Sequence, residues 1–157
     1  MSRVLIWLLC AGAIALACVP RAQTRPARPD STAAAAGSAD SSQSEVLASS
    51  LDVNVSGAVV RFVFHVTNRA DRKVELTFPS GQRYDFAVLD SDGREVWRWS
   101  ADRMFTQSLQ TRLLDPNETL TADERWNPGG RTGRFTAVAQ LRSSNFPIEQ
   151  RVDFTLP

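Results

Sequence analysis

The chain has 157 residues, and its 18 basic residues nearly balance its 17 acidic residues. This balance gives no sign of a nucleic-acid partner, because proteins that bind nucleic acids concentrate Lys and Arg to neutralise phosphates. Both cysteines, Cys10 and Cys18, lie near the N-terminus. The rest of the chain therefore has no thiol for a disulfide, a thiolate nucleophile or a zinc site.

The N-terminus has the form of an export signal. An apolar run at residues 4–16 is short for a membrane span, and Ala15-Leu16-Ala17 has the small residues that a signal peptidase accepts. We therefore expect residues 1–17 to be a signal peptide. Cys18 follows directly and is a candidate lipid-attachment site, although a lipobox usually has Leu where this chain has Ala15. The lipidated form would face the periplasm or the cell surface; simple cleavage and secretion, or one uncleaved membrane anchor, are the alternatives.

Residues 18–44 contain Ala, Ser, Pro, Arg and Asp and almost no large apolar side chain. Such a composition cannot bury enough surface to offset the entropy of the chain. We expect a disordered tether that lets a globular domain stand away from a membrane. Residues 45–157 are enough for one hydrophobic core, so we expect a single folded domain there.

Short strand patterns separated by turn residues fill this domain. The predicted strands lie at residues 51–55, 60–67, 74–78, 84–89, 96–99, 107–114, 120–126, 135–141 and 148–156. Apolar and polar side chains alternate in most of them, as in half-buried strands, and no segment has a sustained helical period. The pattern predicts an all-β fold of about seven to nine short strands in two packed antiparallel sheets. The predicted core contains Phe62, Phe64, Leu76, Phe86 and at least one of Trp97 and Trp99.

An aromatic hairpin is the most distinctive local feature. Its turn is Asp90-Ser91-Asp92-Gly93, in which Gly93 can adopt the positive φ that closes the turn. Alternation places Trp97 and Trp99 on one face of the second strand together with Glu95. In the first strand, Asp85 points away from its aromatic neighbours and is predicted to cap the strand or to pair with Arg83 or Arg94.

The segments FPSGQRYDF at residues 78–86 and GREVWRWS at residues 93–100, followed by Phe105, resemble the signature of the BsuPI-type family of proteinase inhibitors. The resemblance extends from about Val53 to the C-terminus. It implies an immunoglobulin-like β-sandwich and a protein-binding function as a proteinase inhibitor. The inhibitor that names the family acts inside the cell, whereas this chain carries an export signal. An intracellular subtilisin-like serine proteinase therefore cannot be assumed as the target.

The sequence predicts no catalytic residue, metal site or cofactor. His65 is the only histidine, and no nucleophile-elbow motif accompanies it. The alternating carboxylates of Asp90-Ser91-Asp92-Gly93 suit Ca²⁺, but the segment is shorter than an EF-hand loop and is typical of a hairpin turn. Glycines at residues 129–133 do not follow a strand-to-helix pattern and are expected to form a loop. We therefore expect a binding protein and not an enzyme.

Loops on a rigid sandwich carry function more often than its strands. Those at residues 79–83, 100–107 and 127–133 are the best placed for recognition. The predicted partner-contact residues are Pro79, Ser80, Gly81, Gln82, Arg83, Arg103, Met104 and Phe105. In a substrate-like inhibitor, Arg83 or Arg103 could enter the specificity pocket of a subtilisin- or trypsin-like proteinase. The alternatives are a scaffolding module of the bacterial cell envelope and a carbohydrate-binding module with exposed Trp side chains.

Overall fold

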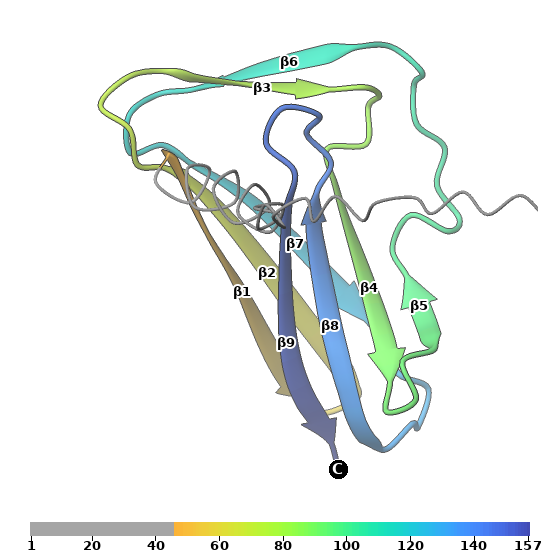
Figure 1. Ribbon diagram of the computed structural model, residues 1–157. Helices are drawn as coiled ribbons and strands as arrows, with labels where there is room; N and C mark the ends of the chain where they lie inside the picture. The colour runs from red at the N-terminus through yellow and green to blue at the C-terminus, as the bar shows by residue number, and fades with distance from the viewer. Residues whose placement is uncertain (1–45) are drawn as a thin grey trace, which may run out of the picture. The chain divides into compact units, whose positions relative to one another are not determined.

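The computed structural model describes residues 46–157. The predicted signal peptide, the predicted tether and Cys18 lie outside these residues. The regular elements from residue 47 onward are strands (Figure 1). They are β1 (Leu47–Ser56), β2 (Val59–Asn68), β3 (Val74–Phe78), β4 (Tyr84–Asp90), β5 (Glu95–Arg98), β6 (Gln110–Leu114), β7 (Thr119–Trp126), β8 (Gly133–Leu141) and β9 (Ile148–Leu156). Within the described part of the chain, no helix is long and apolar enough to cross a membrane.

The strands form two main sheets and one short ribbon, and every pairing is antiparallel. The strand orders are β1-β2-β7 and β5-β4-β8-β9, while β3 pairs with β6. Figure 1 shows β1 beside β9, and the Nε2 atom of Gln150 donates to the Oγ atom of Ser49 at 2.8 Å between these two strands. The predicted antiparallel β-sandwich is confirmed.

The two main sheets are joined by a packed aromatic core. Alternate residues of β2 are buried, from Val60 to Val66. The ring of Phe86, from β4, lies 6.0 Å from that of Phe62 in a stacked arrangement and 6.4 Å from that of Phe64 edge to face. Both geometries are favourable for aromatic pairs. Phe62, Phe64, Leu76 and Phe86 are all buried, as predicted.

The prediction that at least one of Trp97 and Trp99 is buried is wrong. Both rings pack against the core but remain half-buried. The fully buried tryptophan is Trp126 of β7, whose ring lies 6.2 Å from that of Trp97.

Glu95 also differs from the alternation expected of β5. The register with β4 shifts, so that Trp97 lies opposite Val88 while Glu95 lies opposite Leu89, which leaves one extra residue in β5. A bulge of this kind interrupts the two-residue period of a strand. As a result Glu95 does not follow the aromatic face, and its carboxylate instead accepts hydrogen bonds from the guanidinium of Arg98.

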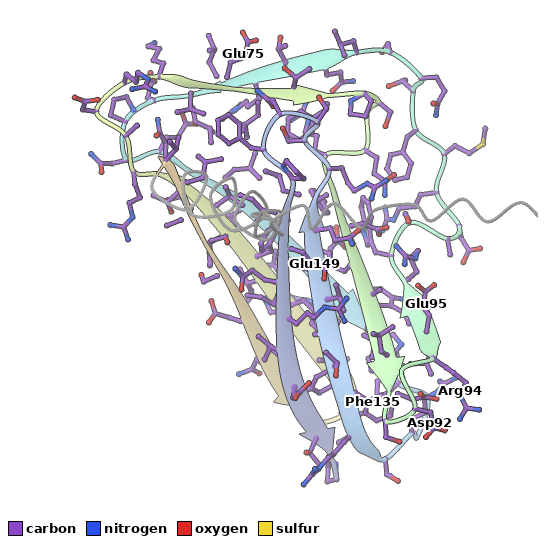
Figure 2. The ribbon with its side chains drawn as sticks, in the orientation of Figure 1. Glu75, Asp92, Arg94, Glu95, Phe135 and Glu149 are labelled. Carbon is purple, nitrogen blue, oxygen red and sulfur yellow. The ribbon has the colours of Figure 1, made fainter. Side chains whose placement is uncertain are left out.

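The β4–β5 turn forms as predicted. Gly93 has φ of 78°, and the Oδ1 atom of Asp90 accepts the backbone N–H groups of Asp92 and Arg94, each at 2.9 Å. These bonds, above all the one from Arg94, lower the pKa of Asp90. Figure 2 shows Asp92 and Arg94 at this turn, at the end of the sandwich away from the β3–β6 ribbon that carries Glu75.

The β3–β6 ribbon covers the other end of the core (Figure 1). Its inward side chains are buried: Val74, Leu76, Phe78 and Leu114. The free edge of β3 is bonded to the β8–β9 loop, where Ser144 donates its backbone N–H to the carbonyl oxygen of Thr77 at 2.8 Å. Strand β6 begins at Gln110 instead of Gln107, so the β5–β6 connection is longer than predicted.

Candidate functional site

Two of the loops predicted to contact a partner meet in space. The β3–β4 loop contains residues 79–83, and the β5–β6 connection contains residues 103–106; together we call them the double-loop surface. Gly81 donates its backbone N–H to the carbonyl oxygen of Thr106 at 2.9 Å. All eight predicted partner-contact residues lie in these two segments. The third predicted loop, at residues 127–133, joins β7 to β8 near the β1–β2 turn and is not part of this surface.

An aromatic platform supports the double-loop surface from below. The ring of Trp99 lies 4.6 Å from that of Tyr84 and 5.6 Å from that of Phe105. The backbone N–H of Trp99 donates to the carbonyl oxygen of Phe86 at 2.9 Å, which ties the backbone of residue 99 to β4. The buried Nε1 atom of Trp99 has no acceptor within residues 46–157, so the indole contributes through ring contact.

Arg103 is anchored on the same platform. Its guanidinium carbon lies 4.3 Å from the centroid of the Trp99 ring, a cation–π distance. Its Nε atom donates to the carbonyl oxygen of Trp99 at 3.2 Å, and its Nη2 atom lies 3.9 Å from a carboxylate oxygen of Glu124. The side chain is thus held along the protein surface.

Tyr84 joins the platform to the opposite sheet. Its hydroxyl donates to the Oε1 atom of Glu124, on β7, at 2.9 Å. Burial raises the pKa of Tyr84 to about 12, and the neighbouring Glu124 carboxylate acts in the same direction by favouring the neutral phenol. At neutral pH the phenol is therefore a hydrogen-bond donor that ties the two sheets together under the loops.

A hollow of about 380 Å³ lies between the two loops. Its lining contains Gly81, Arg83, Tyr84, Trp99, Met104, Phe105, Thr106 and Gln110. A larger hollow of about 600 Å³ lies at the far end of the four-stranded sheet, beside Asp90, Arg151 and Asp153. Asp90 is paired with Arg94 and Arg151 with Glu149, and Asp153 accepts a hydrogen bond from the hydroxyl of Thr136. The smaller hollow is the one that coincides with the predicted contact residues.

The family of the chain follows from its sequence match. The family described as BsuPI, intracellular proteinase inhibitor, matches residues 47–146, which is more than half of the chain and includes both loops and the platform. The chain belongs to the BsuPI family. Among curated proteins, no sequence matches it.

Solved structures resemble the domain only weakly. The β-glucosidase 3B of Thermotoga neapolitana is 15% identical, with a TM-score of 0.40 over 69% of this chain and 15% of that chain. A penta-heme cytochrome c552 of Thermochromatium tepidum is 8% identical, with a TM-score of 0.48 over 74% of this chain and 41% of that chain. The alkylpurine DNA glycosylase AlkC of Pseudomonas fluorescens is 12% identical, with a TM-score of 0.40 over 71% and 30%. This chain spans less than half of each, and these likenesses say nothing of its function.

In this BsuPI domain, Asp85 fixes the base of the β5–β6 connection. Its side chain is 5% exposed, and its Oδ2 atom accepts hydrogen bonds from Arg98 at 2.7 Å and from the hydroxyl of Ser100 at 2.9 Å. The prediction that Asp85 pairs with Arg83 or Arg94 is wrong. Arg98 lies opposite Ala87 in the hairpin, and Ala87 shares a face of β4 with Asp85, so Arg98 is the arginine that reaches the carboxylate. Hydrogen bonds from the guanidinium to Glu95 and Asp85 raise the pKa of Arg98.

Most of the exposed large apolar residues lie in the β5–β6 connection and in β6. Four large apolar residues are exposed within the described part of the chain, and three of them lie in residues 104–113: Met104, Leu109 and Leu113. Met104 is 101% exposed, against 71% for Leu109 and 55% for Leu113. Of these three, Met104 lies in the double-loop surface, whereas Leu113 lies in β6 opposite Glu75, outside that surface.

His65 lies away from the two loops, on the face of β2 opposite the core. Its Nδ1 atom is 3.1 Å from the hydroxyl of Thr121, and its Nε2 atom is 3.7 Å from a carboxylate oxygen of Asp52. It therefore sits on the solvent face, as predicted. Among residues 46–157, no group of three or more His, Cys, Asp or Glu side chains is arranged to hold a metal ion.

Proposed function

We propose that this protein inhibits a serine proteinase by binding it through the double-loop surface, without catalysing a reaction. Membership of the BsuPI family supports the class of function. The observation that carries the proposal is the hydrogen bond between Gly81 and Thr106, which joins the two loops into one surface on a rigid sandwich. Loops held in this way by a scaffold are the usual place for binding residues.

Preorganisation supports an inhibitory role. Binding costs free energy when loops and side chains must be ordered, and a surface that is already ordered avoids part of this cost. Proteinase–inhibitor complexes accordingly form with little backbone movement. Here the β5–β6 connection is tied at its base by Ser100 and Asp85 and farther along by Thr106 and Gly81.

The side chains of Trp97 and Trp99 weigh against the carbohydrate-binding alternative. Sugar recognition requires exposed ring faces, whereas Trp97 stacks on Phe62 at 5.8 Å and Trp99 is covered by Arg103. The envelope-scaffold alternative predicts binding to a neighbouring protein without inhibition of any proteinase. An inhibition assay therefore distinguishes the scaffold function from the proposed inhibitor function.

The test is an inhibition assay of the purified full-length protein against subtilisin-, chymotrypsin- and trypsin-like proteinases at stoichiometric concentrations. We expect at least one of them to be inhibited and to form a complex in size-exclusion chromatography. Gly81→Asp, which places a charge between the loops, should abolish inhibition. Arg131→Ala, in the loop outside the double-loop surface, should leave it unchanged. Failure of the wild-type protein to inhibit any proteinase would favour the scaffolding function.

We also propose that the protein is exported and anchored through Cys18. The apolar run at residues 4–16 and the Ala15-Leu16-Ala17 site support this proposal. Replacement Cys18→Ser should move the protein from the membrane fraction to the soluble fraction, because it removes the residue that would carry the acyl chains. Stable anchoring needs more than one such chain. A wild-type protein that is already soluble after export would show that lipidation does not occur.

A further inference from the structure

We propose that Met104 is the residue that enters the primary specificity pocket of the target, and that the target is a serine proteinase with an apolar pocket. This inference rests on the proposed function and narrows it to one side chain and one class of proteinase. It follows from three features of the β5–β6 connection: the exposure of Met104, the anchoring of its neighbours, and the chemistry of its side chain.

Met104 is the most exposed large apolar residue of the β5–β6 connection, ahead of Leu109 at 71%. Its side chain is 101% exposed. The residues on both sides are packed on the aromatic platform, Arg103 with its guanidinium 4.3 Å from the Trp99 centroid and Phe105 with its ring 5.6 Å from the same indole. The segment therefore presents a single apolar side chain between two anchored neighbours.

The backbone around Met104 is tied to the domain on both sides. Arg103 donates its N–H to the carbonyl oxygen of Ser100 at 3.2 Å, and the carbonyl oxygen of Thr106 accepts the N–H of Gly81 at 2.9 Å. These bonds restrict the segment before a partner arrives, so little ordering cost remains when it binds. A side chain that enters a pocket from such a segment has the properties of a binding hot spot.

The chemistry of the projecting side chain selects the class of proteinase. The primary pocket of a serine proteinase sets specificity, since an apolar slot accepts apolar side chains and an acidic pocket accepts Arg or Lys. Met is apolar, unbranched and adaptable, and it fills irregular apolar cavities well. The two arginines of the surface are already engaged, Arg103 with Trp99 and Arg83 with Gln110 at 3.4 Å.

The experiment measures inhibition constants of the full-length protein for subtilisin, chymotrypsin and trypsin. Met104→Ser should weaken inhibition of the first two roughly 30-fold or more, since truncating a hot-spot residue costs about 2 kcal/mol or more. Leu113→Ser, which removes a similar exposed apolar side chain from β6, should change inhibition by less than about threefold. Met104→Arg should transfer the preference to trypsin. All three variants should unfold at the wild-type temperature, because the replaced side chains are exposed.

The outcomes separate this inference from the function on which it rests. If the wild-type protein inhibits subtilisin or chymotrypsin and Met104→Ser inhibits them equally well, the inference is overturned and the proposed function stands. Equal losses in Met104→Ser and Leu113→Ser would also overturn it, because they would indicate a diffuse apolar contact. If the wild-type protein inhibits trypsin and Arg103→Ala does not, Arg103 and not Met104 enters the specificity pocket, and the inference is overturned. A wild-type protein that inhibits none of the three proteinases overturns both.

Discussion

Gly81 lies so close to Thr106 that a Cβ atom on residue 81 would be 2.6 Å from the Oγ1 atom of Thr106. The same two residues share the 2.9 Å hydrogen bond that joins the loops of the double-loop surface. A Cβ atom at this position would force the hydroxyl of Thr106 to shift, so the absence of a side chain at residue 81 supports the close approach of the two loops.

Gly81→Ala should therefore separate the loops. We expect a loss of about 1 kcal/mol in the free energy of unfolding, the central value for a disruptive substitution, together with weaker inhibition. Urea denaturation measures the first effect and the inhibition constant the second. Thr106→Ala removes the clashing atom, so the double variant should be more stable than the sum of the single effects predicts. If the stability effects of the two single variants simply add in the double variant, the contact between residue 81 and the Thr106 hydroxyl does not cause the loss of stability.

Asp85→Asn should destabilise the domain by about 1.5–3 kcal/mol, because the buried carboxylate loses charge-assisted bonds to Arg98 and Ser100. The matched control is Asp123→Asn, which breaks an exposed pair with Arg61 and should cost less than about 1 kcal/mol. Urea denaturation at neutral pH compares the two. If the two variants lose equal stability, the buried contact has no special role at the base of the loop.

Tyr84 is the only tyrosine of the chain, so its ionisation can be followed by ultraviolet absorbance without interference from a second phenol. We expect it to titrate near pH 12 in the folded protein and near the usual pKa of about 10 in denaturant. Because the folded pKa is the higher one, the neutral phenol stabilises the fold fully below pH 10. That stability should fall as the pH rises from about 10 to 12.

Two variants test this assignment. Glu124→Gln removes the negative neighbour of the phenol and should lower the folded pKa of Tyr84, although burial will keep it above the usual value. Tyr84→Phe should remove the part of the alkaline stability loss that belongs to this group. A single titration near pH 10 in the native wild-type protein would contradict the predicted burial and hydrogen bond.

Asn68 is a buried polar residue that bonds to two other segments, the β2–β3 loop and the end of β6. Its Nδ2 group donates to the carbonyl oxygens of Arg72, Leu114 and Asp115 at 2.8, 3.0 and 3.1 Å. Asn68→Ala should cost about 2 kcal/mol or more in urea denaturation, since it leaves buried carbonyl groups without donors. Asn145→Ala, which removes bonds at an exposed position, should cost clearly less because water replaces them. Equal costs would contradict the role assigned to Asn68.

The sequence by itself determined the strands and their faces. The two-residue period of β2 predicts that Phe62 and Phe64 are buried, and the segment Ile148–Leu156 coincides with β9. Gly93 closes its turn with the expected positive φ. These features depend on neighbouring residues along the chain, because the alternation of side chains and the φ of a turn glycine are local properties.

Only the tertiary structure decided the burial of individual tryptophans and the partners of the charged residues. Trp126 is buried and Trp97 is half-buried although β7 and β5 are both edge strands, so the burial of each ring depends on its contacts across the core. The bulge in β5 moves Glu95 off the aromatic face, and the pairing of β4 with β5 brings Arg98 within ion-pair distance of Asp85.

The same holds for the candidate site. The sequence singled out both loops of the double-loop surface as well as a third loop that lies elsewhere, and it gave no order among the exposed residues. The hydrogen bond between Gly81 and Thr106 joins two loops that are far apart in the sequence. Arg103 packs on Trp99 while Met104 remains exposed, and no periodic pattern in this loop predicts that difference. Strand order and loop contacts are set by long-range packing, which the two-residue period of a strand does not specify.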